Sequence, residues 1–547
     1  MYFLFLTLTM LSSCGTYHSV RHLPDVASYE IEKPVIQQIN DSASVSQYGF
    51  LTKNAYGHYI CYTQGNDYQR GLTTGALTQP LLQKQESLFF EKVKEFVPSK
   101  FKQSLLRQFL KWYNRKMYLH IPNHLQAEIY GISEYSDDTY NYLATKFLRS
   151  MYLHGAHDIG HAMQDLALVG CTSVAAWDSL TEKGKMLVGR NFDFYAGDEF
   201  AEDKLIYICS PDNGFAYASV TWGGMIGVVS GMNESGITVT INAGKSAIPL
   251  QAKTPISLVT REILQFASSI DEAVAIAKKY EVFVSEAILV TNYREKRAVS
   301  IEVSPDNFGV YELPNSDLLV CANHFQSENY VNDKRNTAQI KNSHSQYRFD
   351  RMNELITENE KLTVEKLVSV LRNKEGINDE ALGYGNEKAL NQLLAHHAVV
   401  FEPENQQLWV SSNPYQLGAF VKYDLPSVWE NPVFDNPSIV NPEIIRKDDF
   451  IDNQWFKNYE EYRKINRIIE KSIKNKTDIS AEMIRHYQSL NPDLWSVYYK
   501  IGVYYYQKGW YAAARNEFKK AENKVVTTQY DLENIQKYQR KIQRKIR

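Results

Sequence analysis

The sequence predicts an α+β protein in which β-sheets are covered by helices and a helical tail follows. Three observations predict this class. Apolar residues recur at helical spacing from residue 82 to residue 165, the period changes to that of strands at Cys171, and groups of strands then alternate with pairs of helices up to residue 423. Strand groups separated by helix pairs argue against a doubly wound parallel sheet.

Composition narrows the class of protein. The chain has 547 residues, a formal net charge of -3 and 44% hydrophobic residues, which suits more than one domain with buried cores. A near-neutral balance argues against a nucleic-acid partner, because such partners require a basic surface. The cysteines form no CxxC pair, which argues against a disulfide framework and a thiolate zinc site. They are Cys14, Cys61, Cys171, Cys209 and Cys321.

The first residues resemble a bacterial lipoprotein signal peptide. Residues 1–13 are almost wholly apolar and lead directly into Cys14, and the run is too short to span a bilayer. Cleavage before Cys14 would leave this residue to carry lipid, so the resemblance implies a protein anchored in the bacterial cell envelope, in the periplasm or at the outer membrane. The alternative is a truncated or mis-started secretion signal. Residues 14–60 are mixed and polar, which predicts a tether.

Two long segments follow the predicted tether. Residues 61–170 are expected to be helical, and residues 171–425 are expected to form the main domain, which begins with a β-hairpin over residues 171–192. Amphipathic helices are expected at residues 86–97, 103–118 and 137–153, with a turn-and-helix boundary at 128–134. Later strands are expected at residues 205–209, 215–222, 227–230, 237–242, 287–292, 298–303, 309–313, 318–322, 398–401, 408–411 and 419–423, and later helices at 256–268, 270–279, 346–356 and 364–372.

The end of the chain is predicted to be a separate helical region. Prolines and asparagines cluster in residues 426–450, which predicts a linker, and residues 451–547 are helical and charged. One unit in this tail has the small and aromatic residues of a tetratricopeptide repeat, whereas an independent solenoid needs about three units. The tail is therefore either a binding module for a protein partner or a helical pair packed on the main domain. The unit comprises Tyr498, Ile501, Gly502, Tyr505, Gly509, Tyr511, Ala514, Phe518 and Ala521.

The dipeptide Gly170-Cys171 stands where the first strand begins. An ordinary thiol has a pKa of about 8.5 and is a weak nucleophile at neutral pH. If the peptide bond before Cys171 were cut, the new α-amino group, with a pKa of about 7.7–8.0, would supply the base. Gly170 tolerates the strained backbone that such a cut requires. Alone, the pair is equally consistent with a small buried residue at the start of a strand.

Charged and amide side chains accompany this cysteine. Arg190 and Asp193 end the returning strand of the hairpin, where Arg190 would favour the thiolate and Asp193 would hold the α-amino group. Asn242 and Asn323 end later strands, where an amide N–H could stabilise an oxyanion, and Arg348 begins a helix. Each also has an ordinary structural explanation, such as a surface ion pair at the hairpin end or an asparagine in a turn.

Five motifs together resemble the acyl-coenzyme A:6-aminopenicillanic-acid acyltransferase (isopenicillin N acyltransferase-like) family of N-terminal-nucleophile hydrolases, which also include choloylglycine hydrolases and penicillin V acylases. The resemblance covers residues 80–425. The motifs are Gly170-Cys-Thr-Ser173, Gly189-Arg-Asn-Phe-Asp193, Met232-Asn-Glu-Ser-Gly236, Ala322-Asn-His-Phe325 and Ser345-Gln-Tyr-Arg348.

The resemblance implies an αββα sandwich, autoproteolysis between Gly170 and Cys171, and cleavage or transfer at a linear amide through a thioester acyl-enzyme. It implies Cys171 as the nucleophile, oriented and tuned by Arg190 and Asp193. Asn242 and Asn323 are implied as oxyanion donors and Arg348 as a supporting charge. The long segment before Cys171 favours the acyltransferase-like branch over the bile-salt branch.

A metal site is the less favoured explanation of one histidine cluster. His157 and His161 share a helix face with zinc-ligand spacing, but the resemblance implies neither a metal nor a cofactor. The cluster also contains His154, Asp158 and Asp165.

The sequence thus predicts a self-processing cysteine amidohydrolase or acyltransferase that acts on a small N-acyl amide or acyl-thioester substrate. Two alternatives remain: an amidase of the choloylglycine hydrolase or acyl-homoserine-lactone acylase type, and an inactive envelope scaffold that uses its helical tail.

Overall fold

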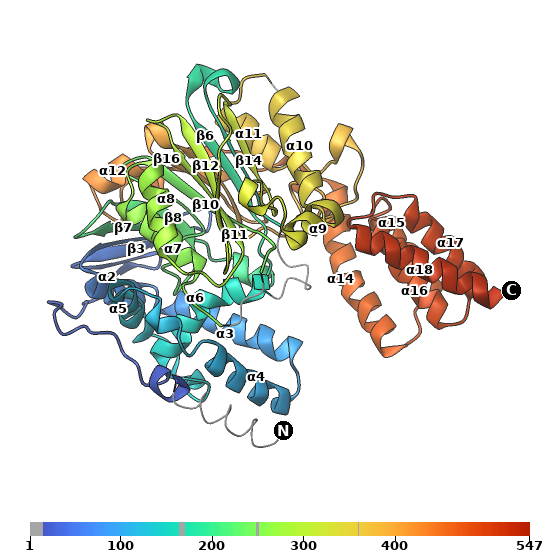
Figure 1. Cartoon of the computed structure of the whole chain (residues 1–547), viewed down its shortest axis with the longest axis horizontal. Helices are drawn as coiled ribbons and strands as arrows, with labels where there is room; N and C mark the ends of the chain where they lie inside the picture. The colour runs from blue at the N-terminus through green and yellow to red at the C-terminus, as the bar shows by residue number, and fades with distance from the viewer. Residues whose placement is uncertain (1–14, 163–169, 248–250, 359, 547) are drawn as a thin grey trace.

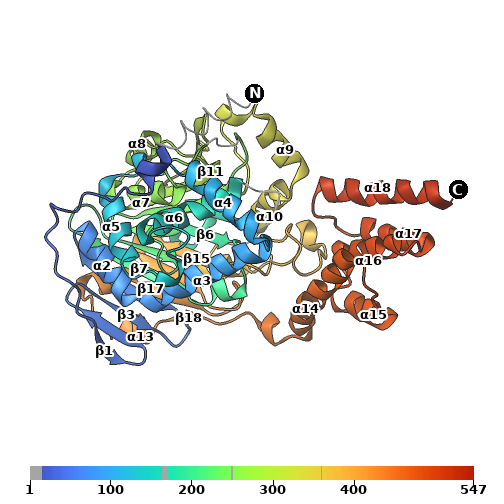
Figure 2. The ribbon, with the colours of Figure 1, turned by 90° about the horizontal axis from the view of Figure 1, so that it is seen from below.

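The structure is a computed structural model that describes residues 15–162, 170–247, 251–358 and 360–546. Two β-sheets pack face to face, helices cover their outer faces, and a group of helices extends from one side (Figures 1 and 2). The described part of the chain therefore has the α+β class that the sequence predicts.

The larger sheet combines strands from both sides of Cys171. Its neighbouring strands are antiparallel except for β4 and β7, which pair in parallel over seven residue pairs from Tyr59↔Leu205 to Gly65↔Pro211. In spatial order its strands are β1 (Gln37–Asn40), β2 (Ala43–Ser46), β3 (Gly49–Lys53), β4 (Tyr59–Gly65), β7 (Leu205–Pro211), β8 (Tyr217–Thr221), β9 (Ser230–Asn233), β10 (Ile237–Ala243), β11 (Glu286–Asn292), β12 (Arg297–Val303) and β13 (Phe308–Tyr311).

The smaller sheet is antiparallel throughout and begins the main domain. Its central hairpin pairs Thr172 with Asn191 and Ala176 with Leu187. In spatial order its strands are β14 (Leu318–Cys321), β5 (Thr172–Ala176), β6 (Leu187–Phe192), β15 (His397–Glu402), β16 (Gln407–Ser411), β17 (Phe420–Asp424) and β18 (Ile444–Ile445).

Alternating apolar side chains build the four layers. On β10, Val239 and Ile241 face α7 (Ile256–Phe266) and α8 (Ile270–Lys279). On the smaller sheet, Ala175 and Val188 join the core between the two sheets. The opposite face of β5 packs against α10 (Ser345–Glu358) and α11 (Val364–Leu371). Because a strand presents successive side chains to opposite faces, each sheet buries both surfaces, and the order of layers is αββα, the order that the resemblance implies.

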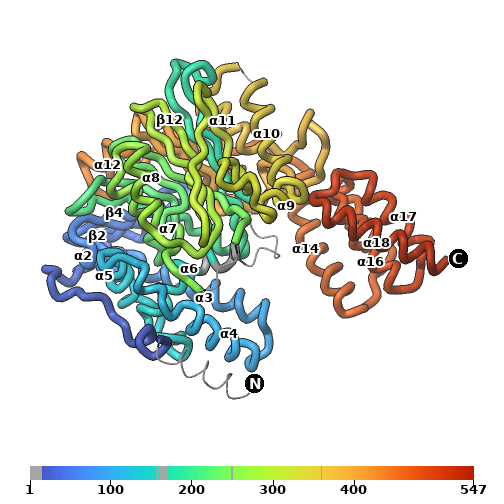
Figure 3. Tube along the Cα trace, in the orientation of Figure 1, coloured from blue at the N-terminus to red at the C-terminus, as the bar shows by residue number. Residues whose placement is uncertain are grey.

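The predicted tether over residues 14–60 is wrong from residue 37 onward. Residues 37–53 form β1, β2 and β3, and β4 begins at Tyr59, so this segment completes one side of the larger sheet (Figure 3). The strands are short, and β1 is exposed along its whole length. The exposed edge strand β1 has no buried face, and β2 and β3, of four and five residues, are too short to show a clear apolar alternation. The sequence pattern therefore did not reveal them.

The helical segment before Cys171 packs against the main domain. Residues 128–134, expected to be a boundary, lie mostly within α5, which packs on α2 in the clusters around Leu72 and Leu125. The helices are α2 (Asp67–Leu77), α3 (Gln79–Phe96), α4 (Lys100–Tyr113), α5 (Asn123–Ser133) and α6 (Lys146–Ala162).

The C-terminal region is helical, and it contacts the main domain. A cluster around Tyr459 and Tyr487 also includes Leu393 and Leu417 of the main domain. Gly502 of α16 lies so close to Phe518 of α17 that a Cβ would meet its ring at 2.9 Å, as expected for a tight helical pair. The helices are α14 (Gln454–Asn475), α15 (Ala481–Leu490), α16 (Trp495–Gln507), α17 (Tyr511–Glu522) and α18 (Gln529–Ile546).

The predicted linker, residues 426–450, is only partly irregular. It contains most of α12 (Leu425–Glu430) and all of α13 (Pro437–Val440), and β18 pairs Ile444 with Val421 of β17. Ile439 is buried in the core between the sheets. The segment is therefore packed on the sandwich. A composition rich in proline and asparagine could not distinguish packed turns from a free linker.

A buried carboxylate joins the segment before Cys171 to the main domain. Glu128 of α5 accepts hydrogen bonds from Arg70 of α2 at 2.8 Å and Arg261 of α7 at 2.9 Å. Each of the three side chains is at most 1% exposed. Removing one partner of a buried pair leaves the other charge without compensation.

We therefore expect Glu128→Ala to lower the free energy of unfolding by about 3–5 kcal/mol, because Arg261 would remain buried without its carboxylate and Arg70 would keep only its ion pair with Asp67. Urea unfolding followed by circular dichroism would measure the change. Glu95→Ala is the control, since its ion pair with Lys92 is on the surface and such pairs contribute about 0–1 kcal/mol. Equal losses in the two variants would contradict the prediction.

Candidate active site

The β5–β6 hairpin brings Cys171 beside Arg190 and Asp193. Cys171 directly precedes β5, and the register pairs Ser173 with Arg190. At the same end, the Gly170 N–H donates to the Asp193 carbonyl at 3.1 Å. The antiparallel return therefore places the predicted nucleophile and both charged residues at one end of the sandwich.

Cys171 is buried and contacts a buried guanidinium. Its Sγ lies 3.5 Å from Nη2 of Arg190, and the residue is 1% exposed. Arg190 also donates to the carbonyls of Val229 and Ile241 at 2.6 Å each, which fixes it across the gap between the two sheets. Burial raises the pKa of the Cys171 thiol, although Arg190 opposes the shift. In the continuous chain this cysteine therefore requires a base before it can act as a nucleophile.

Asp193 is a buried carboxyl group near two arginines. Burial raises its pKa to about 7, and Arg348 and Arg190 each oppose this shift. Its Oδ2 lies 3.4 Å from Nε2 of Gln392, whereas Oδ1 has no hydrogen-bond partner among the described residues. The free oxygen is the acceptor that a nearby amino group would need.

The two predicted amide donors hold the strands around the site together. Asn242 donates to the Cys321 carbonyl at 2.9 Å and accepts from Ser173 Oγ at 2.8 Å. Asn323 donates to the Ala243 carbonyl at 2.9 Å. Because a side-chain amide carries two N–H groups, each asparagine retains one N–H that makes no hydrogen bond to the described residues. Their role as oxyanion donors stays a prediction.

Arg348 links the nucleophile to the second asparagine. From α10, it donates to the Cys171 carbonyl and to Oδ1 of Asn323, both at 2.6 Å. The side chain is fully buried, and burial lowers its pKa to about 10, whereas Asp193 raises it. Its contacts orient neighbouring groups and do not reach the sulfur. Contacts thus link Cys171 with Arg190, and Arg348 with Cys171 and Asn323. Asp193 and Asn242 join this group through Gly170 and Ser173, which lie close to Cys171 in the chain.

Sequence patterns missed one residue at this site. Gln392 donates from Nε2 to the Gly170 carbonyl oxygen at 2.8 Å and is 2% exposed. A Cβ on Gly170 would lie 2.4 Å from that nitrogen, so the glycine also makes room for the amide. Gln392 stands in a loop before β15, in none of the motifs, and a lone glutamine carries no periodic or spacing pattern that would identify it.

The histidine cluster has structural contacts where it is described. His154 contacts the Ser150 carbonyl and accepts from the Ile226 N–H at 3.1 Å, and Asp158 accepts from the Ile256 N–H at 2.8 Å. The side chains of His157, His161 and Asp165 lie outside the described residues, as does Cys14. Across the described part of the chain, three or more metal-ligand side chains come together nowhere.

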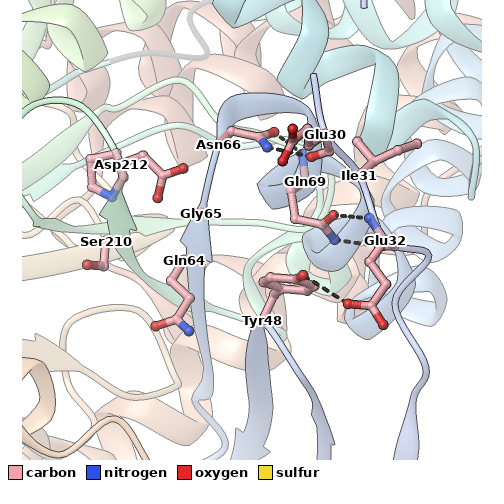
Figure 4. Close-up of a pocket in the computed structure, with 11 residues that line it drawn as sticks. Glu30, Ile31, Glu32, Tyr48, Gln64, Gly65, Asn66, Gln69, Ser210 and Asp212 are labelled. Atoms are coloured by element: carbon pink, nitrogen blue, oxygen red, sulfur yellow. Dashed lines mark hydrogen bonds between the residues drawn. The ribbon is translucent and has the colours of Figure 1, made fainter. Parts of the chain in front are cut away.

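A polar hollow on the described surface lies away from Cys171. It has a volume of about 570 Å³ and is lined by polar and acidic groups around the end of β4 and the start of α2 (Figure 4). Gln69 exchanges two 2.8 Å hydrogen bonds with the backbone of Glu32, and Tyr48 donates to the Glu32 carboxylate at 3.0 Å. None of the predicted site residues lines this hollow, which results from the docking of residues 30–32 on α2.

Residues 179–414 match the family described as acyl-coenzyme A:6-aminopenicillanic acid acyl-transferase. An uncharacterized protein of Archaeoglobus fulgidus is 25% identical over 404 residues, which cover 66% of this chain and 64% of that protein. The N-acylethanolamine-hydrolyzing acid amidase of Caenorhabditis elegans is 25% identical over 221 residues, 39% of this chain and 58% of the amidase. The chain thus spans less than two thirds of the length of either relative.

Two solved structures have lower sequence identities to this chain. An N-acylethanolamine-hydrolyzing acid amidase ortholog of Caenorhabditis elegans has a TM-score of 0.31 and 20% identity, covering 43% of this chain and 93% of that one. A conjugated bile acid hydrolase of Clostridium perfringens has a TM-score of 0.30 and 12% identity, covering 51% of this chain and 97% of that one.

The raised pKa of Asp193 predicts a pH-dependent stability. A carboxyl group with a folded-state pKa of about 7 and an ordinary pKa of 3.8 binds more protons in the folded state between these values. Stability must therefore fall as the pH rises through this window. We expect a Cys171→Ala chain to lose stability between pH 5 and pH 8, and a Cys171→Ala/Asp193→Asn chain to lose less. Urea unfolding at both pH values measures the difference, and equal slopes would contradict the assignment.

Proposed function

We propose that this chain, whose residues 179–414 match the acyl-coenzyme A:6-aminopenicillanic acid acyl-transferase family, is a self-processing cysteine amidohydrolase or acyltransferase acting on linear amides. The observation that carries the proposal is the environment of Cys171. Its sulfur lies against the buried Arg190 guanidinium, and Gly170 is hydrogen-bonded to Asp193, the residue that would hold the new amino group. The family match begins eight residues after Cys171, so the nucleophile itself is assigned from geometry and sequence.

Self-processing begins with an acyl shift. Sγ of Cys171 attacks the Gly170 carbonyl carbon, the C–N bond breaks, and the thiol proton ends on the departing nitrogen. Water then displaces sulfur from the thioester, which leaves a Gly170 carboxylate, a free thiol and an α-amino group on Cys171. The new amine lies beside Asp193, whose free oxygen would hold it.

Turnover uses the same sulfur on an N-acyl substrate. The α-amine of Cys171 takes the thiol proton and returns it to the leaving amine, because its pKa of about 7.7–8.0 suits both transfers near neutral pH. Arg190 stabilises the thiolate. Asn242 and Asn323 supply N–H groups to the oxyanion, and Arg348 keeps Asn323 in place. Water or another amine then takes the acyl group.

The substrate is proposed to be a small N-acyl amide or acyl-thioester. The Caenorhabditis elegans relative is named for hydrolysing N-acylethanolamines, which makes these amides the first compounds to assay. Conjugated bile acids and acyl-homoserine lactones test the alternative amidase types. A panel of all three classes, with release of the free amine as readout, separates them.

Membrane placement is proposed to combine Cys14 lipidation with α4. Gly15 lies beside Arg115, because a Cβ on this glycine would start 3.6 Å from Arg115 Cδ. On α4, Phe101, Leu105 and Phe109 are 79%, 63% and 51% exposed, and the spacing puts them on one helix face. Residues 100–116 contain six basic and no acidic side chains. An apolar face among cations suits an anionic lipid surface. In the described chain no helix meets the length and hydropathy of a membrane span.

The helical tail supports the site loop in this proposal, and binding of a protein partner is its alternative role. Asn491 exchanges hydrogen bonds of 3.1 and 2.8 Å with the backbone of Tyr384, and Tyr459 donates to the Leu393 carbonyl at 3.4 Å. These contacts favour the packed helical pair over an independent repeat array. An inactive scaffold would show neither processing nor turnover.

The central prediction concerns Cys171. The wild-type protein should appear in intact-mass spectra as two fragments that meet between residues 170 and 171, and Cys171→Ala should stay whole and lose at least 10⁴-fold of N-acyl amide hydrolysis, about the scale of losing a nucleophile. Cys209→Ala is the control, because Cys209 is equally buried in the larger sheet. An uncut wild-type chain that hydrolyses amides would contradict the proposal.

The membrane proposal predicts that Cys14 carries lipid. Cys14→Ser should abolish incorporation of labelled palmitate during growth, since Cys14 is the cysteine that directly follows the apolar run, whereas Cys61→Ala should incorporate it normally. Adding Phe101→Ser, Leu105→Ser and Phe109→Ser to Cys14→Ser should further reduce co-sedimentation with phosphatidylglycerol vesicles. Label that persists in Cys14→Ser would rule out this anchor.

A further inference from the structure

Gln392 is the described side chain that donates to the carbonyl oxygen of the proposed scissile bond. Its Nε2 lies 2.8 Å from the Gly170 oxygen and 3.4 Å from Oδ2 of Asp193. The amides of Asn242 and Asn323 donate instead to the carbonyls of Cys321 and Ala243. In the continuous chain the Gly170 oxygen therefore has its own donor.

We infer that Gln392 is the oxyanion donor of self-processing, a role that rests on the proposed function. When Sγ of Cys171 adds to the Gly170 carbon, the carbonyl π electrons move to oxygen, and the Gln392 N–H stabilises that charge. The electrons then return, the bond to the Cys171 nitrogen breaks, and the thiol proton is left on that nitrogen. Fixed donors aimed at a developing oxyanion act most strongly where water is excluded, and this amide is 2% exposed.

The loop that carries Gln392 is held from both sides. Inside the sandwich domain, the N–H of Asn391 donates to the Asn373 carbonyl at 2.8 Å. On the other side, Tyr459 of α14 donates to the Leu393 carbonyl, and Gly383 lies so close to Leu494 that a Cβ would meet its nitrogen at 2.3 Å. Anchors on both neighbours of Gln392 limit its movement, so its amide is positioned before the reaction.

This arrangement separates two oxyanion sites. Gln392 serves the Gly170 carbonyl, which belongs to the chain, while Asn242 and Asn323 serve the carbonyl of a substrate. Loss of Gln392 should therefore slow processing more than it slows turnover by chains that have already been cut.

The test follows cutting of the full chain at timed intervals after cell-free synthesis, by intact mass. Gln392→Leu should slow cutting about 100- to 1,000-fold, the usual effect of losing one oxyanion donor. The matched control is Gln126→Leu. Gln126 is also a buried amide, 5% exposed, that donates to backbone carbonyls, those of Tyr118 and Ile121. Its loss should leave the cutting rate within about twofold, because it contacts no reacting atom.

A second variant separates chemistry from folding. In Gln392→Glu the shape is kept, but the ionised carboxylate cannot donate, so its cutting rate relative to wild type should rise as the pH falls and the carboxyl group becomes protonated. If the wild-type chain is cut and Gln392→Leu is cut equally fast, this inference is overturned but the proposed function is not. Equal slowing by Gln126→Leu, or a flat Gln392→Glu ratio, also overturns it. A wild-type chain that is never cut overturns the proposed function instead.

Discussion

The buried guanidinium of Arg190 is the interaction on which the site depends. Its three described contacts to backbone and sulfur join β6 to the opposite sheet and to Cys171. A guanidinium in a dry interior is costly unless its N–H groups are paired, so the carbonyls of Val229 and Ile241 must remain where they are. The same arginine that tunes the sulfur therefore fixes the distance between the sheets at this end of the sandwich.

Much of the site could be predicted because its residues stand at ends of regular elements. The hairpin period located Cys171, Arg190 and Asp193 at one end, and the strand ends located Asn242 and Asn323. An antiparallel register follows directly from an alternating pattern and a short turn. The covering of the sheets by helices could also be predicted, since strand groups between helix pairs leave few ways to cover two sheet faces.

Other features could not be predicted, because their stability comes from contacts far apart in the sequence. The strands β1, β2 and β3 are held by pairing with β4, which itself lies beside β7 about 140 residues later. Gln392 is placed by a loop that the tail clamps, and neither composition nor spacing encodes that contact. The packing of the proline- and asparagine-rich stretch after residue 425 could not be predicted either, since its burial depends on the sheet beneath it.

The parallel pairing of β4 with β7 has a consequence for a chain cut after Gly170. The larger sheet would then be built from two polypeptides, with residues 37–65 on one and β7 onward on the other, and Glu128 would bind Arg261 across the same boundary. The sheet first forms within one chain. If the two polypeptides separated after the cut, forming it again would be a bimolecular reaction. Refolding of the cut protein would therefore depend on the concentration of the two polypeptides. After denaturation and dilution, the cut protein would not recover the fold that the uncut chain reaches by itself.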